Sequence, residues 1–365
     1  MKTILFIFHI PPPVHGSSIV GSYIKNITLI NKKFSTDFIN LSTSSKLNEI
    51  GKYNLSKLSR LISILFNIVS NNFKMSYDLC YLAIAINGKA FYRDLIIVLL
   101  LKLFGNKIVL HLHNKGAASF NNIFRKLGYR YVFNNTKVIL LSDLLYDDIE
   151  KYVMKEQVYI CPNGIPDSSQ LKINKKSIDE IVNILFLSNI MIEKGVLILL
   201  EACAKLKERG QKFICHFVGG WKDLSQRKTE ELITMKGLEN LVFFHGPKYD
   251  KEKNKYFESA DIFVFPTYYK QECFPLVLLE AMQYSLPVIS TSKGGIPDIV
   301  IEDETGFLCP QKDIDCLVEK IELLVNNPEL RTKMGEAGRK RFEENFTLEN
   351  FERRFTDIIE KIVNE

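Results

Sequence analysis

The sequence lacks the patterns that mark several common classes of protein. It contains no GxGxxG motif, which argues against a dinucleotide-binding oxidoreductase. Its seven cysteines are scattered and include no CxxC pair. We therefore expect neither a zinc site nor a disulfide framework, and a reducing, cytoplasmic compartment. Four histidines likewise show no metal-ligand spacing: His9, His15, His216 and His245.

Long apolar runs are also scarce. After the first ten residues the longest is 95–101, far below the roughly 20 residues that a membrane-spanning helix needs. Residues 1–10 imitate a signal peptide, but the run is short, stops at three consecutive prolines and has no small-residue cleavage site. A first buried parallel strand explains this segment better.

The length of the chain and its alternation of strand-like and helix-like segments predict two α/β domains. The chain has 365 residues, 46% hydrophobic and 25% charged, which is a globular composition but too long for one ordinary core. Short apolar runs alternate with amphipathic stretches, as in βαβ units with parallel sheets. Residues 165–178 are polar, contain proline and lack periodicity, as in a linker. We expect doubly wound domains at 1–170 and 171–347, with a helix of about 348–365 packing back on the first.

The apolar runs place five strands in each half, and the 3–4 spacing after Gly195 predicts a helix that stops at Gly210. Further helices are expected at 55–71 and 121–133. The expected strands cover residues 3–10, 78–84, 107–113, 137–142, 158–162, 182–188, 212–219, 240–246, 261–266 and 287–291.

Charge is distributed unevenly. The net charge is +6, but residues 1–170 carry +10 and the remainder −4. A basic half suggests an anionic partner such as a membrane surface, and no nucleic-acid recognition motif accompanies it. Residues 52–74 suit a membrane-surface helix, although a core-facing helix with a solvated edge fits equally well. Its stripe is Leu58, Leu61, Ile62, Leu65, Phe66 and Val69, and a second basic group is Arg125, Lys126, Arg130 and Lys137.

The strongest chemical signal is a pair of glutamates, Glu272 and Glu280, separated by seven residues. If a helix begins near Pro275, the first lies in the preceding loop and the second inside the helix. The free N–H groups of residues 274–277 would then form an anion site. Both carboxylates could accept hydrogen bonds from sugar hydroxyls. Taken alone, an amphipathic helix with incidental glutamates is an equal alternative.

With its surroundings, this segment resembles the E-x7-E motif of the retaining glycosyltransferases of family four, which have the two-Rossmann-domain GT-B fold. Further matches follow in the family's order at 162–166, 193–195, 218–220, 260–266, 287–291, 294–298 and 305–310. The resemblance implies transfer of a hexose-type sugar from a nucleotide-diphosphate donor, with UDP favoured, and retention at the anomeric carbon.

The resemblance also assigns donor-binding roles. Glu272 would lie by the donor sugar, Glu280 would bind the ribose, and Lys194 would contact the diphosphate. A cation there would neutralise the charge that develops as the nucleotide leaves. The implied donor loop also includes Phe274, Pro275 and Leu276.

Three positions in two segments depart from the family's pattern. Asn189 stands where the family usually has a second diphosphate-binding Arg, and an amide donates hydrogen bonds but supplies no charge. Either leaving-group stabilisation is weaker or another cation compensates. Candidates are Lys293, Lys115 and His15. In the donor loop, Cys273 and Pro275 replace two glycines, and proline is tolerated in a first helical turn.

In the first half, residues 11–18 resemble the family's glycine loop, in which Gly16 would let the backbone approach the donor phosphates. His113 matches a histidine that points at the donor sugar, whereas a buried, hydrogen-bonded histidine is the alternative. Asp313 and Asp315 form a DxD pattern that helix capping explains better than metal binding. We expect no metal and no other cofactor.

The resemblance implies catalysis by positioning and electrostatic stabilisation, with the departing phosphate as base. The expected acceptor is a saccharide, lipid-linked, in polysaccharide, lipopolysaccharide, O-antigen or capsule synthesis at the inner membrane face. Two alternatives stay open. One is a nucleotide-sugar 2-epimerase on the same scaffold, and the other is a non-catalytic subunit that binds nucleotide or lipid.

Overall fold

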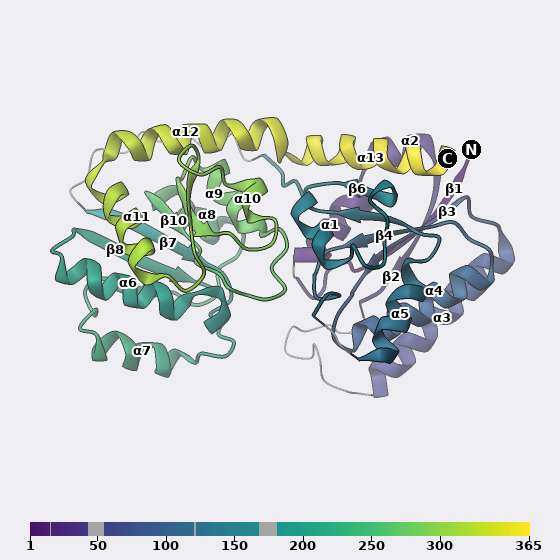
Figure 1. Cartoon of the computed structure of the whole chain (residues 1–365), viewed down its shortest axis with the longest axis horizontal. Helices are drawn as coiled ribbons and strands as arrows, with labels where there is room; N and C mark the ends of the chain where they lie inside the picture. The colour runs from purple at the N-terminus through teal and green to yellow at the C-terminus, as the bar shows by residue number, and fades with distance from the viewer. Residues whose placement is uncertain (15, 43–54, 120–121, 168–180) are drawn as a thin grey trace. The chain divides into compact units, whose positions relative to one another are not determined.

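The computed structural model describes residues 1–14, 16–42, 55–119, 122–167 and 181–365, and the chain divides into two compact units (Figure 1). The first unit contains residues 1–163 and 348–365, and the second contains residues 164–347. Most of the expected linker at 165–178 lies outside the described residues, as does His15. Within the described ranges, no helix is long and apolar enough to cross a membrane.

The first unit is built on a parallel sheet in the order β2-β1-β3-β4-β5-β6. Strands β1, β3 and β4 are almost fully buried, which explains why they appear in the sequence as continuous apolar runs. The N-terminal run is therefore a strand, as expected. The bounds are β1 (Thr3–Phe8), β2 (Ser35–Asn40), β3 (Leu79–Ile84), β4 (Ile108–Leu112), β5 (Lys137–Leu140) and β6 (Val158–Ile160).

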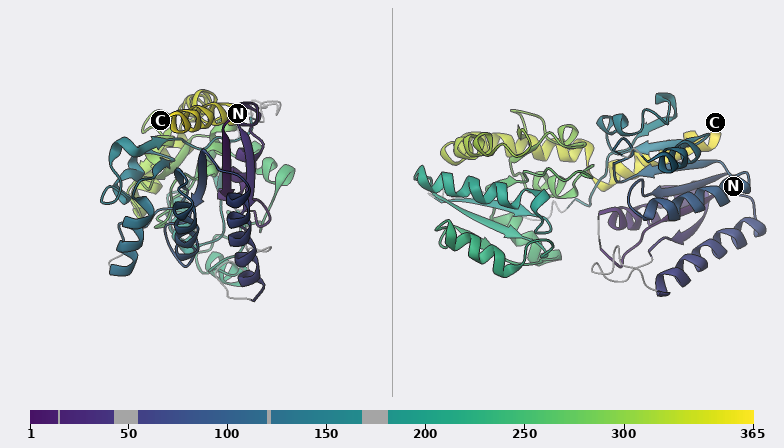
Figure 2. Two further views of the ribbon diagram at one scale, coloured as in Figure 1. Left: turned by 90° about the vertical axis from the view of Figure 1, so that its right-hand side faces the viewer. Right: turned by 60° about the horizontal axis from the view of Figure 1, so that its bottom comes forward.

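Helices flank this sheet, and the C-terminal helix α13 (Leu348–Asn364) belongs to the same unit (Figure 2). It is held by an ion pair of 2.6 Å between Lys33 and Glu360, and by the Lys107 ammonium, which donates to the Ile362 carbonyl. The Phe355 ring packs edge-on against Tyr81 of β3. The other α-helices are α1 (Gly16–Lys25), α2 (Thr28–Lys33), α3 (Leu55–Lys74), α4 (Ala90–Leu103) and α5 (Ile123–Phe133).

The second unit repeats this plan with the strand order β12-β11-β10-β7-β8-β9, also all parallel. Its strands are β7 (Val182–Leu187), β8 (Phe213–Val218), β9 (Val242–Phe244), β10 (Ile262–Val264), β11 (Val288–Thr291) and β12 (Gly306–Cys309). Its α-helices are α6 (Val196–Glu208), α7 (Gln226–Met235), α8 (Asp250–Ser259), α9 (Leu276–Gln283), α10 (Ile296–Ile299), α11 (Ile314–Asn326) and α12 (Pro328–Asn345).

All ten expected strands form, but the sequence analysis missed β2 and β12. Strand β2 lies at a sheet edge and is largely exposed or half-buried, so it has no continuous apolar run. Strand β12 is only four residues long and begins at Gly306. Helix α6 forms as predicted, with its buried face on the 3–4 spacing and its end just before Gly210.

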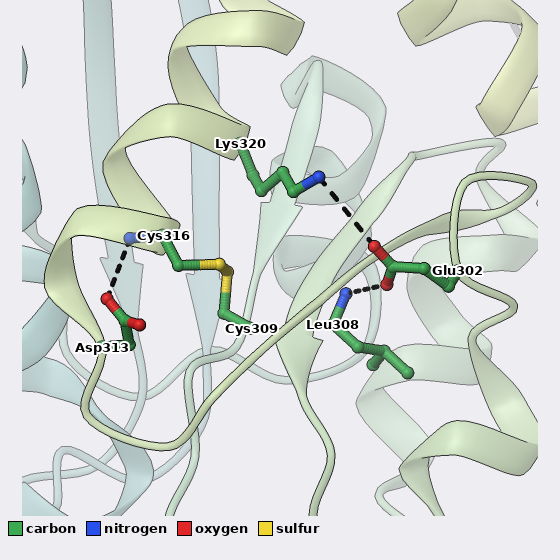
Figure 3. The surroundings of a disulfide bond; sticks show 6 residues. All are labelled: Glu302, Leu308, Cys309, Asp313, Cys316 and Lys320. Carbon is green, nitrogen blue, oxygen red and sulfur yellow. Dashed lines mark hydrogen bonds and ion pairs between the residues drawn. A yellow bond between two sulfur atoms is a disulfide. The ribbon is translucent and has the colours of Figure 1, made fainter.

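The sequence analysis expected no disulfide framework and did not foresee the one bond that forms, between Cys309 and Cys316 (Figure 3). Cys309 ends β12, and Cys316 lies in the first turn of α11. Asp313 caps this helix by accepting a hydrogen bond of 3.0 Å from the Cys316 backbone N–H, and the two Cα atoms lie 5.9 Å apart. The strand–turn–helix connection therefore makes the pair, which spacing along the sequence does not reveal.

The other five cysteines are free and buried, as small apolar side chains often are. Because one pair is bonded, cysteine usage no longer supports a reducing compartment for this chain. The capping role expected for Asp313 is confirmed, while Asp315 pairs with Lys205 at 2.5 Å.

We expect the protein denatured without reductant to show five thiols that react with iodoacetamide, and seven after reduction. Reduction should lower the free energy of unfolding by roughly 2 kcal/mol, because the cross-link restricts the unfolded chain. Cys309→Ser should cause the same loss and abolish the effect of the reductant. Mass spectrometry that counts seven reactive thiols before reduction would contradict the bond.

Candidate functional site

The donor residues expected in the second unit lie on loops that follow neighbouring strands. Strand β7 leads into residues 188–195, β10 into 265–275 and β11 into 292–295. Because these strands are parallel and adjacent in the sheet, the loops after them gather at one sheet edge, where ligands of such folds usually bind.

At this edge Lys194 and Glu272 form an ion pair, with 2.7 Å between Nζ and Oε2. The Thr267 hydroxyl donates to the same carboxylate oxygen at 3.1 Å. The ammonium also lies 4.7 Å from the centre of the Tyr269 ring. Both charged side chains are largely buried, with exposed fractions of 15% for the lysine and 8% for the glutamate. Charges stay buried only when they are paired in this way.

Two glycines allow these loops to meet. Gly195 has a φ of +91°, and a Cβ there would lie 2.2 Å from the Pro266 carbonyl oxygen. Gly294 has a φ of +59°, and its Cβ would lie 2.2 Å from the Glu272 carbonyl oxygen. Only glycine fits such positions without strain. The backbone next to Lys194 and the backbone of Glu272 are therefore each fixed by a close contact.

Glu280 lies inside α9. The ammonium of Lys253, on α8, holds one oxygen of the Glu280 carboxylate at 2.8 Å. Its other oxygen, Oε2, is buried and has no hydrogen-bond partner within the described part of the chain. A buried acceptor without a partner costs about 1–3 kcal/mol. A hydroxyl group on a ligand would relieve that cost.

Tyr284 follows Glu280 by one helical turn, and its hydroxyl is another buried polar atom without a partner in the residues described. Burial, together with the nearby Glu258 and Glu280 carboxylates, raises the pKa of Tyr284 to about 12. The phenol therefore stays protonated at neutral pH and can donate a hydrogen bond.

The start of α9 matches the expected helix, since Pro275 is its N-cap and Leu276 its first residue. The expected anion site needs one correction, because proline carries no N–H. The donors of this turn are limited to Phe274, Leu276 and Val277. The Phe274 ring is buried edge-on against Phe346 at 5.8 Å, so that side chain supports the loop.

Asn189 is exposed two residues after β7, and its backbone carbonyl accepts from the Met191 N–H at 2.8 Å. A Cβ on Gly220 would lie 3.5 Å from the Asn189 side-chain oxygen, so the loop after β8 runs beside it. Within the described residues, the side-chain hydrogen bonds of Lys194 and Glu272 run to each other and to Thr267, not to Asn189.

Gly16 and His113 belong to the first unit. Gly16 is the first residue of α1, and a Cβ there would meet nothing within 4 Å. His113 follows β4 and is half-buried, with its ring 4.2 Å from that of His111. His111 is fully buried against the Tyr81 hydroxyl at 2.7 Å, and burial lowers its pKa, as does His113. His111 is therefore the buried, neutral histidine of the pair.

The sequence analysis missed four residues of this site: Thr267, Tyr269, Lys253 and Tyr284. Thr267 and Tyr269 directly follow the strand segment at 260–266, so their place after a strand was the available signal. Lys253 reaches Glu280 only through the packing of α8, which no local pattern reveals. In the described ranges, no group of three or more His, Cys, Asp or Glu residues could hold a metal ion.

The segment that contains these loops was compared with models of known protein families. Residues 169–341 match the family model described as glycosyl transferases group 1. This segment of the chain resembles a group 1 glycosyl transferase domain. It contains Lys194, Glu272 and Glu280, and it ends before α13 returns to the first unit.

Two similar proteins carry names from bacterial polysaccharide biosynthesis. The putative colanic acid biosynthesis glycosyltransferase WcaL of Escherichia coli is 26% identical over 244 residues, covering 64% of this chain and 59% of the relative. The capsular polysaccharide biosynthesis glycosyltransferase CapM of Staphylococcus aureus is 26% identical over 229 residues, covering 59% of each. The chain thus spans about three fifths of the length of these relatives.

A solved structure shares the fold over the whole chain. HepE of Anabaena, in complex with UDP and glucose, superposes with a TM-score of 0.70 at 17% identity and covers 99% of this chain and 100% of HepE. Likeness at this identity shows the fold alone. Together with the two parallel six-stranded sheets, it confirms the expected architecture of two Rossmann-like domains.

We expect Gly195→Ala to lower the free energy of unfolding by roughly 3 kcal/mol, because the new methyl group meets Pro266 in addition to the strained backbone. Gly210→Ala is a matched control. Its φ is also positive, at +70°, but nothing lies within 4 Å, so its cost should be about 1 kcal/mol. Equal losses in urea unfolding would show that the contact with Pro266 has no energetic weight.

Proposed function

We propose that this protein is a retaining glycosyltransferase that moves a hexose-type sugar from a nucleotide-diphosphate sugar to a saccharide in cell-surface polysaccharide synthesis. The observation that carries the proposal is the largely buried pair of Lys194, on the loop after β7, and Glu272, on the loop before α9, with the unpartnered Glu280 oxygen inside that helix. The names of WcaL and CapM support the biosynthetic class. The UDP in HepE supports a UDP-sugar as donor.

Glu280 is proposed to bind the ribose. Lys253 fixes one oxygen of its carboxylate at 2.8 Å, which leaves Oε2 as an oriented acceptor for a ribose hydroxyl. Orientation in advance lowers the entropy lost on binding. Tyr284 offers a hydroxyl donor one turn later, in the same buried surroundings.

Lys194 is proposed to bind the donor diphosphate. On arrival of the donor, phosphate oxygens would take the place of the Glu272 oxygen as partners of the ammonium. The Glu272 carboxylate could then accept a hydroxyl of the donor sugar while keeping its hydrogen bond from Thr267. The N–H groups at the start of α9 add partial positive charge for the same anion.

The reaction requires that the bond between the anomeric carbon and the β-phosphate oxygen breaks while the acceptor oxygen attacks from the same face. The departing phosphate takes the proton of the acceptor hydroxyl, so no protein nucleophile is needed. Glu272 is engaged by Lys194 and Thr267, in agreement with a binding role. The largest contribution from the protein is then stabilisation of charge on the leaving phosphate.

The first unit is assigned the acceptor and, by resemblance, donor contacts from Gly16 and His113. A lipid-linked acceptor and attachment to an anionic membrane surface are supported by the net charge of +10 in residues 1–170. A thermal-shift panel of UDP- and GDP-sugars tests donor choice. Incubation with the donor alone separates the transferase from a 2-epimerase, which would convert it without acceptor.

Glu280→Ala should weaken UDP binding by roughly 1–3 kcal/mol, because a ribose hydroxyl loses its buried acceptor. Isothermal calorimetry on the folded variant measures this loss. Glu231→Ala, on the exposed face of α7, is the matched control and should leave UDP binding unchanged. Unchanged affinity in folded Glu280→Ala would remove the ribose-binding role.

Lys194→Ala should lower kcat by about 100-fold or more, roughly 3 kcal/mol, with a smaller effect on donor affinity. The reason is that negative charge on the β-phosphate grows only as the glycosidic bond lengthens. Lys194→Arg should restore part of the rate, which a loss of folding alone would not explain. Asn189→Arg should be tolerated and should raise kcat if no other cation serves the diphosphate.

Lys205→Ala removes an exposed cation from α6 in the same unit and should leave kcat unchanged. If Lys194→Ala keeps most of the wild-type rate, another cation stabilises the leaving group or the reaction takes place elsewhere.

A further inference from the structure

We propose that helices α3, α4 and α5 together form a docking surface for an anionic phospholipid membrane. The inference deepens the proposed function, on whose lipid-linked acceptor it rests, by naming the surface that meets the lipid. The three helices are neighbours in the first unit, since α3 packs on α4 and α4 packs on α5 (Figure 1).

Helix α3 has two apolar faces where a core helix needs one. Ile64 and Ile68 are buried and account for its packing on the unit. A second set of apolar side chains has exposed fractions between 55% and 78%; three of them repeat at four-residue intervals, and the fourth is the penultimate residue of the helix. This set is Leu58, Ile62, Phe66 and Phe73.

The other two helices carry equivalent stripes. On α4 the exposed large apolar residues are Tyr92, Ile96, Leu99 and Leu103, and on α5 they are Ile123, Phe124, Leu127 and Tyr131. The three helices thus hold twelve of the 23 large hydrophobic side chains exposed in the described residues. Single exposed apolar residues are ordinary, but a concentration on adjacent helices marks an interaction surface.

The charges of these helices identify the occupant. They contain eight cations and one carboxylate, Asp94, which is fully buried and paired with Arg93 at 2.6 Å. Arg93 is engaged by Asp94 and Arg125 is buried, so six of the cations can serve the surface: Lys57, Arg60, Lys74, Lys102, Lys126 and Arg130. Exposed apolar stripes edged by cations are what a helix lying in the interface of an anionic bilayer requires.

A second copy of the chain fits this surface less well. Two such faces would bring like charges together, which opposes self-association. The surface also does not need a membrane span, because none of the helices in the described ranges is long and apolar enough to cross. The three helices would lie in the plane of the membrane, with their aromatic and aliphatic side chains among the lipid head groups.

The experiment is co-sedimentation of the full chain with phosphatidylcholine vesicles, with and without phosphatidylglycerol. The wild-type protein should sediment with the anionic vesicles at low salt and be released by added salt. Ile62→Ser/Phe66→Ser/Phe124→Ser should lower the partition coefficient roughly tenfold or more, because three exposed apolar groups no longer enter the lipid. Arg60→Glu/Arg130→Glu should lose binding chiefly at low salt.

Met235→Ser/Leu323→Ser is the matched control, since both residues are exposed apolar side chains of the second unit. It should sediment as the wild type does. A triple serine variant that binds vesicles like the wild type would overturn the proposal. The proposal would also fail if analytical ultracentrifugation showed that the wild type is a dimer and that the only effect of the triple serine substitution is to make it a monomer. A second copy of the chain would then cover the surface.

UDP binding, measured by calorimetry on the same proteins, separates this proposal from the proposed function. The triple serine variant should bind UDP as the wild type does. A wild-type protein that binds UDP but ignores anionic vesicles at every ionic strength refutes the docking surface and leaves the glycosyltransferase proposal intact.

Discussion

The close approach of three loops in the second unit is the constraint on which the candidate site depends. Gly195 lies against Pro266, and Gly294 lies against the Glu272 backbone, each at a distance that admits no Cβ. These contacts set Lys194 beside Glu272 in a nearly buried place, where each charge requires the other. An arriving anion can replace the carboxylate at Lys194 only if Glu272 receives hydrogen bonds in exchange, from Thr267 and from a hydroxyl of the ligand. Donor binding and loop packing are therefore parts of one arrangement.

Buried polar atoms and exposed apolar atoms point to function for the same physical reason, since each is in an unfavourable environment that a partner would relieve. In the second unit these atoms are the Glu280 oxygen and the Tyr284 hydroxyl. In the first unit they are the outer stripes of α3, α4 and α5. In the two proposals, the second unit offers a polar edge to a nucleotide and the first unit offers an apolar, cationic face to a lipid surface.

The local elements could be predicted where their physical cause is local. Buried parallel strands such as β1 and β3 are continuous apolar runs, and α6 has its apolar face on a regular spacing that stops before a glycine. Strand β2 was missed because an edge strand need not be apolar. The stripe in residues 52–74 left two interpretations open, because a core face and a lipid face consist of the same residue types. Burial of Ile64 and Ile68 separates the core face from the exposed stripe.

The sequence by itself determined the fold class, the order of the motifs and the Glu272–Glu280 segment, because these depend on spacing along the chain. Only the tertiary structure decided the contacts that join distant segments. Lys253 reaches Glu280 from another helix, and Cys309 meets Cys316 across a strand–turn–helix connection. The pairing of Lys194 with Glu272 likewise spans two loops. Such contacts depend on how strands order in a sheet, which side-chain periodicity does not encode.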